Sequence, residues 1–458
     1  MSIVEGYEAD PMAAIFVSWS DTSMTYRLPV KLGLVTLTML LAIATLVGCA
    51  VRSDDAGEAS EKSGLSHVEA GHDFDTIGGT REKGNSQVKK GDYDSVIAAF
   101  TEAIRLDPRS VSAHYYRGIA YQKAGDLDNA IADYAEAIRI DPNHPEMHGV
   151  YVYRGRAFRD KHDLDKGLLD FTEAIRREPK DGVGYSERGA TYGEKGDIER
   201  ALADFNEAIR LDPKLAGAYA GRAAVYLDKG DLDKAFGDCT RALRLDPKDA
   251  VAYHNRGLAY KRKGELDKAL ADLAEGIRLD PRLALAYYNR GLVYREKGDV
   301  ESAIADFTQA ISLDPKLAEA YRNRGLAHQD RNHFDKAIAD FTQAIRLRPE
   351  MADAYGNRGY AYAVAGRDLE KAIADFSEAI RLNPTNAADY FNRGNAFADK
   401  GEPDEAIADL TEAIRLDPKL GAAYHARGQV YEKMGEKAKA DEDFGCAKKL
   451  GYEAELKP

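Results

Sequence analysis

The chain has 458 residues, a formal net charge of −13 and three cysteines. A chain with this excess of acidic residues has no electrostatic basis for neutralising phosphates, so we expect no nucleic-acid partner. Three cysteines in so long a chain also exclude a disulfide framework as the basis of the fold.

The first feature along the chain is an apolar run at residues 32–51, preceded by two basic residues. This arrangement is typical of a secretory signal rather than of a folded element. The run contains the sequence LVGC at residues 46–49, which resembles the lipobox of bacterial lipoproteins. The resemblance implies that residues 1–48 form a signal region that is removed and that Cys49 carries the lipid. The alternative is an uncleaved helix, since the run is about long enough to span a membrane.

The segments on either side of this run are polar. Four acidic residues precede it where a signal sequence needs basic ones, which favours Met24 as the true start. Residues 49–78 are polar without helical periodicity and predict a flexible tether. Because Ala50 rather than aspartate follows the lipidation site, the lipoprotein resemblance implies release to the outer membrane. We therefore expect a lipid-anchored protein of the bacterial cell envelope that faces the periplasm, with a single-pass inner-membrane anchor as the alternative.

From residue 79 to residue 454 the sequence repeats with a period of mostly 34 residues. Within each repeat, apolar and small residues recur at helical spacing in two successive segments, separated by a turn residue that is usually glycine. A period of this size is typical of a solenoid, in which each repeat buries its apolar face against its neighbours. Ten prolines in register mark the period: Pro108, Pro142, Pro179, Pro213, Pro247, Pro281, Pro315, Pro349, Pro384 and Pro418.

We number each repeat so that residues 182–215 carry positions 1–34. Small residues at positions 8, 20 and 27, aromatic residues at positions 4, 11 and 24 and proline at position 32 resemble the signature of the tetratricopeptide repeat family. This resemblance implies an all-α fold, a right-handed α-solenoid superhelix of about eleven helix-turn-helix repeats with polar caps. The predicted repeat starts are Ile77, Val111, His148, Gly182, Ala216, Ala250, Ala284, Ala318, Ala352, Ala387 and Gly421.

A few repeats depart from the pattern. The turn glycine is replaced by His162 and by Asn332, two residue types that enter the left-handed region more readily than most. Repeat three carries an inserted loop at residues 143–147, and repeat nine gains one residue near Arg367. Because insertions between helices are tolerated, we expect neither to change the fold.

Position 7 is arginine and position 23 is aspartate in ten repeats, for example Arg256 and Asp272. A partly buried guanidinium prefers a planar carboxylate partner, so we predict that each arginine bonds a position 23 aspartate of its own repeat or of a neighbour. The alternative is that both side chains face water. Either way we expect the role of these residues to be structural.

The family resemblance implies that the first helix of each repeat lines the concave face through positions near 2, 5, 6, 9, 12 and 13. Asparagine stands at position 6 in five consecutive repeats, which resembles the asparagine ladder of O-linked N-acetylglucosamine transferase. Such a row can hold an extended peptide backbone. The alternative is that each asparagine bonds its own scaffold. The predicted peptide-binding residues are Asn255, Asn289, Asn323, Asn357 and Asn392, with His254, Tyr288, Arg322 and Phe391 at position 5 and Tyr360 at position 9.

No pattern of catalytic residues stands out, and we predict neither an enzyme nor a cofactor. The nearest approach to a metal motif is His144 and His148, with Glu146 between them and His162 downstream. Because Pro145 interrupts a regular helical pair at that spacing, we predict solvated loop histidines and no metal site.

These features predict a membrane-anchored interaction scaffold of the bacterial envelope, which binds an extended segment of a partner protein in its concave groove. The sequence leaves two alternatives. One is an accessory subunit of an envelope enzyme, such as a cell-wall hydrolase, or of a secretion or assembly machine. The other is a self-assembling structural protein.

Overall fold

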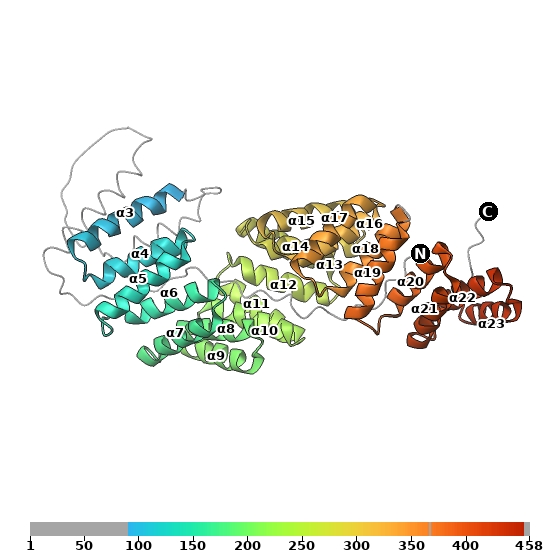
Figure 1. Ribbon diagram of the computed structural model, residues 1–458. Helices are drawn as coiled ribbons and strands as arrows, with labels where there is room; N and C mark the ends of the chain where they lie inside the picture. The colour runs from blue at the N-terminus through green and yellow to red at the C-terminus, as the bar shows by residue number, and fades with distance from the viewer. Residues whose placement is uncertain (1–89, 366–367, 453–458) are drawn as a thin grey trace, which may run out of the picture. The chain divides into compact units, whose positions relative to one another are not determined.

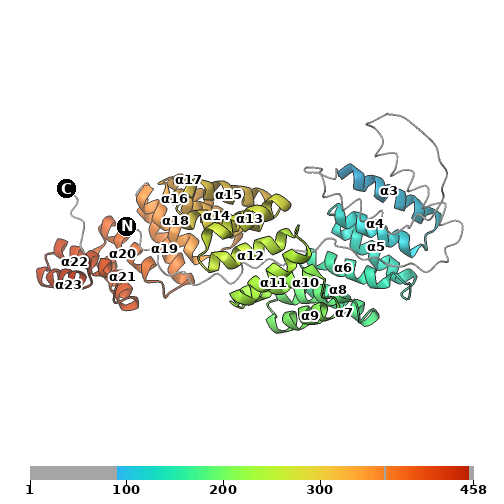
Figure 2. The same cartoon turned by 180° about the vertical axis from the view of Figure 1, so that it is seen from behind.

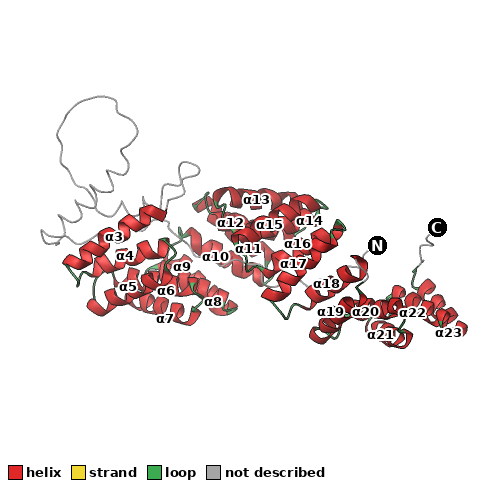
Figure 3. Cartoon of the chain, turned by 45° about the horizontal axis from the view of Figure 1, so that its top comes forward, coloured by secondary structure: helices red, strands yellow, loops and turns green. Residues whose placement is uncertain are grey.

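The structure is a computed structural model that describes residues 90–365 and 368–452 (Figure 1). All regular structure in these residues is α-helical, in 21 helices, as the uniform red of the elements in Figure 3 shows. None of the described helices is long and apolar enough to cross a membrane. The predicted signal region with Met24, the lipidation site Cys49 and the tether lie outside the described residues.

The chain divides into two compact units, one ending at Pro247 and one starting at Lys248. In both, consecutive helices lie side by side in pairs, which Figure 2 shows from behind. The first unit contains α3 (Lys90–Leu106), α4 (Val111–Lys123), α5 (Leu127–Ile140), α6 (Met147–Asp160), α7 (Leu164–Arg177), α8 (Gly182–Glu194), α9 (Ile198–Leu211), α10 (Ala216–Asp228) and α11 (Leu232–Leu245). The second contains α12 (Ala250–Arg262), α13 (Leu266–Leu279), α14 (Ala284–Glu296), α15 (Val300–Leu313), α16 (Ala318–Asp330), α17 (Phe334–Leu347), α18 (Ala352–Ala365), α19 (Leu369–Leu382), α20 (Ala387–Lys400), α21 (Pro403–Leu416), α22 (Gly421–Lys433) and α23 (Lys437–Lys449).

This order of elements confirms the predicted all-α solenoid of helix-turn-helix repeats. From α4 onward, each first helix begins at the predicted residue except α6, which begins at Met147, one residue before the predicted His148. The predicted first helix of repeat one and the extra residue near Arg367 lie outside the described residues.

The turn inside each pair follows from local chemistry. Asp197 is the N-cap of α9, and its side chain accepts a hydrogen bond from the backbone N–H of Arg200. Just before it, Gly196 has a φ of 76°, in the left-handed region. His162 and Asn332, which replace this glycine in two repeats, have φ values of 60° and 58°, so the expectation that they tolerate this conformation is confirmed.

From repeat two onward, the centre of each repeat is a side chain at position 24 packed on a small residue at position 8. In repeat eight, a Cβ on Gly325 would lie 2.8 Å from Cε1 of the fully buried Phe341, so glycine is what leaves room for the ring. Repeat five shows the inverse, because Ala223 replaces the glycine and the buried Cys239 replaces the ring. The methyl group that Ala223 adds and the volume that is lost when Cys239 replaces an aromatic ring compensate one another.

Each arginine at position 7 makes two hydrogen bonds to the aspartate at position 23 of its own repeat. Arg256 donates from Nε to Oδ2 of Asp272 over 2.6 Å and from Nη2 to Oδ1 over 2.8 Å. The Asp272 side chain is 11% exposed, and these bonds raise the pKa of Arg256 above its ordinary value. The other pairs are Arg117 with Asp133, Arg154 with Asp170, Arg188 with Asp204, Arg222 with Asp238, Arg290 with Asp306, Arg324 with Asp340, Arg358 with Asp375, Arg393 with Asp409 and Arg427 with Asp443.

Several of these arginines also reach the preceding repeat. Nη1 of Arg324 donates to Oγ1 of Thr308, at position 25 of repeat seven, over 3.1 Å. Arg393 makes the equivalent bond to Ser377 of repeat nine over 3.0 Å. The arginine lies on the first helix of its repeat. Its guanidinium therefore bonds two second helices, one in its own repeat and one in the preceding repeat.

Candidate functional site

Three of the five asparagines predicted to bind a peptide are buried inside the second unit. Asn255, Asn289 and Asn323 are at most 3% exposed. Nδ2 of Asn289 donates to the carbonyl oxygen of Leu285 over 2.9 Å, and Nδ2 of Asn323 donates to that of Glu319 over 2.9 Å. Each of these two carboxamides thus bonds the backbone one turn earlier in its own helix.

These asparagines also contact side chains at position 5 of the preceding repeat. Nδ2 of Asn289 lies 3.0 Å from Nε2 of His254, and Nδ2 of Asn323 donates to the hydroxyl of Tyr288 over 3.1 Å. Burial lowers the pKa of His254 to about 4, so its imidazole is neutral at physiological pH. The structure places these side chains in the contact between neighbouring repeats, so Asn289 and Asn323 bond the scaffold, as the alternative interpretation of the asparagine row expected.

The remaining residues of the predicted set lie in repeats eight to ten. Asn357 and Asn392 are half-buried. Arg322 forms an ion pair with Asp353 of the next repeat, and Phe391 packs against the core of repeat ten. These contacts leave Tyr360 as the exposed member of the set.

An apolar patch on α18 combines Tyr360 with Val364, one helical turn further on. Their exposed fractions are 38% and 48%. They occupy positions 9 and 13, which share one face of the helix. At position 9 of repeats six and eight, the apolar residues Leu258 and Leu326 are buried, whereas Tyr360 exposes its ring. We call Tyr360 and Val364 the repeat-nine patch.

Acidic side chains occupy the positions next to this patch. Position 13 is Asp330 in repeat eight and Asp399 in repeat ten, and both are exposed. Asp330 also forms an ion pair with Arg295. Deeper in repeat ten, burial raises the pKa of Asp389 to about 6, with a smaller contribution from the charge of Asp353. The repeats on either side of the patch therefore carry carboxylates at the position equivalent to Val364.

In the first unit the corresponding positions hold a charge cluster that sequence reasoning missed. Nη2 of Arg156 lies 2.7 Å from Oε1 of Glu187, and Nη1 of Arg159 lies 2.9 Å from Oε2 of the same carboxylate. Glu194 lies 3.5 Å from Arg159, and burial raises its pKa to about 7. Because Arg159 and Glu187 are nearly fully buried and bond one another, the cluster joins repeats three and four and does not present an open site.

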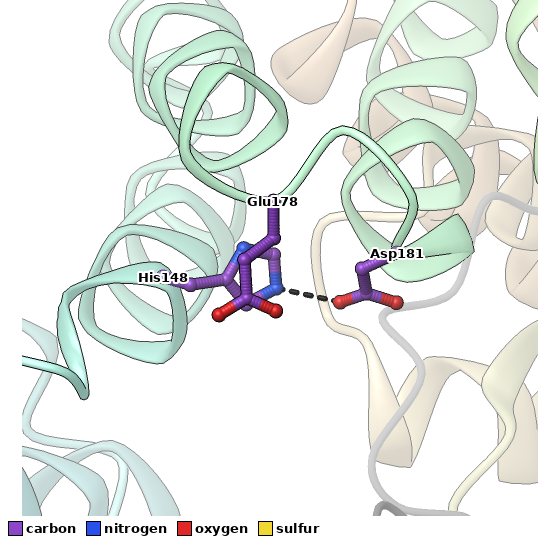
Figure 4. Close-up of side chains that lie close together, drawn as sticks. All are labelled: His148, Glu178 and Asp181. Carbon is purple, nitrogen blue, oxygen red and sulfur yellow. Dashed lines mark ion pairs between the residues drawn. The ribbon is translucent and has the colours of Figure 1, made fainter.

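His148, predicted to be a solvated loop residue, is instead 4% exposed in the first turn of α6. Its Nε2 lies 2.6 Å from Oδ2 of Asp181 (Figure 4). One ligand atom each from His148, Glu178 and Asp181 lies within 4.8 Å of the other two, which makes this the single group in the described ranges that gathers metal-ligating atoms in this way. The predicted neighbours His144, Glu146 and His162 are not part of it.

Family models match most of the repeat region. Models described as tetratricopeptide repeat match residues 81–145, 216–249, 239–271 and 322–387, and one described as TPR repeat matches residues 189–230, 260–296, 291–332 and 394–435. Together these matches cover more than half of the chain.

Two solved structures are among those that are similar to this chain. Human IFIT1, solved as a dimer with m7Gppp-AAAA, is 17% identical, with a TM-score of 0.51 over 80% of this chain and 88% of its own. YrrB, described as a TPR protein with an unusual peptide-binding site, is 26% identical, with a TM-score of 0.38 over 41% of this chain and 97% of its own. No curated protein matches the sequence.

Proposed function

Because this chain belongs to the tetratricopeptide repeat family, we propose that it is a non-enzymatic scaffold that binds an extended segment of a partner protein. The observation that carries the proposal is the repeat-nine patch, where Tyr360 and Val364 expose apolar surface. Their positions, 9 and 13, belong to the set that the family resemblance implies for the concave face. Aromatic and aliphatic anchors with a polar surround are typical of recognition surfaces. The carboxylates of Asp330 and Asp399 favour a segment that carries basic residues beside its apolar one.

The test is peptide binding by the full chain, followed by fluorescence anisotropy. We expect extended peptides with a leucine or phenylalanine flanked by lysines to bind more tightly than the same peptides flanked by glutamates. Added salt should reduce this difference, because it screens exposed charges. Changing both Tyr360→Ser and Val364→Ser should weaken binding by about tenfold or more, the loss expected when central apolar anchors are removed.

Leu169→Ser is the matched control, because Leu169 is also an exposed apolar residue, 70% exposed, but lies on a second helix of the other unit. It should leave the affinity unchanged. Equal loss in this variant, or unchanged binding by the patch variant, would show that the repeat-nine patch is not the binding surface.

We also propose that residues 1–48 direct the chain to the bacterial envelope and that lipid on Cys49 anchors it there. On this proposal the repeats face the periplasm, with the outer membrane preferred over the inner and an uncleaved inner-membrane helix as the alternative. The apolar run and the LVGC sequence support the proposal, and the partner would then be an envelope protein.

Mass spectrometry of the purified native protein tests the anchor. We expect a mature N-terminus at Cys49 that carries lipid mass, and we expect Cys49→Ser to keep the preceding segment, because the lipidated cysteine is the processing site. A native protein that retains residues 25–48 without added lipid would instead support the uncleaved helix.

A further inference from the structure

The first helix of repeat three carries a buried histidine where the other described repeats have none. Position 1 is alanine, glycine or valine in those repeats, whereas His148 places an imidazole there. Nδ1 of His148 lies 3.2 Å from the carbonyl oxygen of Ala174 in α7. Because a carbonyl oxygen can only accept, Nδ1 carries the proton, and Nε2 is left to face the loop between α7 and α8.

Two carboxylates of that loop converge on the imidazole (Figure 4). Asp181 is the N-cap of α8, and its Oδ1 accepts from the backbone N–H of Val183 over 3.0 Å. This bond orients the carboxylate so that Oδ2 lies 2.6 Å from Nε2 of His148. Glu178, at the end of α7, stands at position 31, where most repeats have the shorter aspartate.

The short contact between the imidazole and Asp181 requires a positive charge, carried either by a proton on the ring or by a metal ion bound beside it. With the proton on Nδ1, a neutral His148 presents a lone pair at Nε2, and the facing Oδ2 of Asp181 also presents one. That oxygen is buried, and no hydrogen bond of regular geometry reaches it. Two such lone pairs repel at this distance unless a proton or a metal ion lies between them. The second carboxylate, that of Glu178, favours an ion of higher charge than a proton.

We propose that His148, Glu178 and Asp181 form a binding site for a zinc ion, with one further coordination position left for water. One imidazole and two carboxylates are ligands that zinc takes in proteins. A backbone carbonyl that accepts from the other ring nitrogen, as that of Ala174 does here, is the usual support of a metal-bound histidine.

Holding the ion requires the three ligand atoms to move by no more than about 1.5 Å relative to one another. Zinc lies about 2.0–2.2 Å from nitrogen and oxygen ligands, which sets tetrahedral ligand atoms roughly 3.3 Å apart. The three ligand atoms lie within 4.8 Å of one another, so they are close enough to share one ion. Nε2 and Oδ2, now 2.6 Å apart, would have to separate by less than about 1 Å. A bound ion would join the start of α6 to the loop that leads into α8, and so would clamp repeat three to repeat four.

Zinc titration of the metal-free full chain by calorimetry tests the proposal. We expect one site per chain that is lost in His148→Ala, a variant that should fold because alanine occupies this position in several other repeats. Glu178→Gln and Asp181→Asn should each weaken zinc binding by at least about tenfold. Removing a residue that only hydrogen-bonds a metal ligand already costs about that much, and these two carboxylates would bind the ion directly. Asparagine keeps an N-cap oxygen for α8, so Asp181→Asn removes the charge and not the cap.

His144→Ala, in the loop just before α6, is the control and should bind zinc as the native chain does. Zinc should also raise the unfolding temperature of the native chain and of His144→Ala but not of His148→Ala, because a ligand stabilises the state that binds it. Equal zinc binding by all variants would overturn the proposal, since the ion would then be held elsewhere. Absence of binding by the native chain would also overturn it and would leave a protonated His148 paired with Asp181.

Discussion

Replacing Phe341 by alanine should lower the local free energy of unfolding of repeat eight by about 3–5 kcal/mol, the cost of removing a fully buried aromatic ring. Phe341 is 0% exposed and packs against Leu326, Ala337 and the bare Cα of Gly325. Glycine and alanine at these positions cannot move to fill the cavity, because neither has side-chain atoms to rearrange. Hydrogen exchange of α16 and α17, read by mass spectrometry, should show the loss of protection.

Phe341→Leu is the matched control for this change. Leucine occupies the same position in repeats six and ten, as Leu273 and Leu410, and both are 0% exposed. The substitution should therefore cost less than about 1.5 kcal/mol, in the range of tolerated hydrophobic exchanges. If alanine and leucine gave the same protection as phenylalanine, the ring would not be the centre of the repeat.

Replacing Arg256 by alanine should lower the free energy of unfolding by about 3 kcal/mol, because it leaves the Asp272 carboxylate buried without its guanidinium partner. An exposed ion pair would instead contribute about 0–1 kcal/mol, so the size of the loss distinguishes the two arrangements. Urea denaturation followed by circular dichroism, together with hydrogen exchange of α12 and α13, measures it.

Arg278→Ala is the control within the same repeat. Arg278 also bonds a carboxylate through Nε and Nη2, that of Glu275, but its side chain is 67% exposed. Stability should stay unchanged in this variant. A second check is Arg256→Ala combined with Asp272→Ala, which should be less destabilising than Arg256→Ala alone because no unpaired charge remains. No loss in Arg256→Ala would contradict a structural role for the pair.

The sequence predicted the helices well because each repeat carries its own boundary chemistry. The proline at position 32, the turn residue and the capping aspartate recur together, so α8 begins at Gly182 and α16 at Ala318, as predicted. The pairing of Arg256 with Asp272 could be predicted from the joint occurrence of the two residue types. Sequence alone left open whether the partner lay in the same repeat.

The asparagine row could not be predicted in the same way. Periodicity gives the direction in which a residue points from its helix, but it does not give the distance to the neighbouring repeat. His254 and Tyr288 lie between neighbouring repeats. They accept hydrogen bonds from Asn289 and Asn323, respectively, so these carboxamides are enclosed. In repeat nine, by contrast, Tyr360 and Val364 leave apolar surface of the same helix face accessible.

The cluster at His148 escaped prediction for a different reason. Its carboxylates, Glu178 and Asp181, follow the histidine by 30 and 33 residues, far beyond the spacing of a local metal motif. A comparison between repeats would have shown that His148 is unusual, because position 1 holds small or aliphatic residues in the other repeats. Such a difference marks an unusual repeat, but only the folded chain shows which carboxylates the histidine meets.

Each arginine and aspartate pair is complete within one repeat, and this has a consequence for how the gene can change. A duplication or deletion of one whole repeat adds or removes the arginine and the aspartate together, so it never leaves a buried charge without its partner. The bonds to the preceding repeat are dispensable at a new junction, since Ala135 and Ala274 replace the hydroxyl-bearing residue at position 25 in repeats two and six. The array can therefore lengthen or shorten by recombination in whole units without redesign of the scaffold.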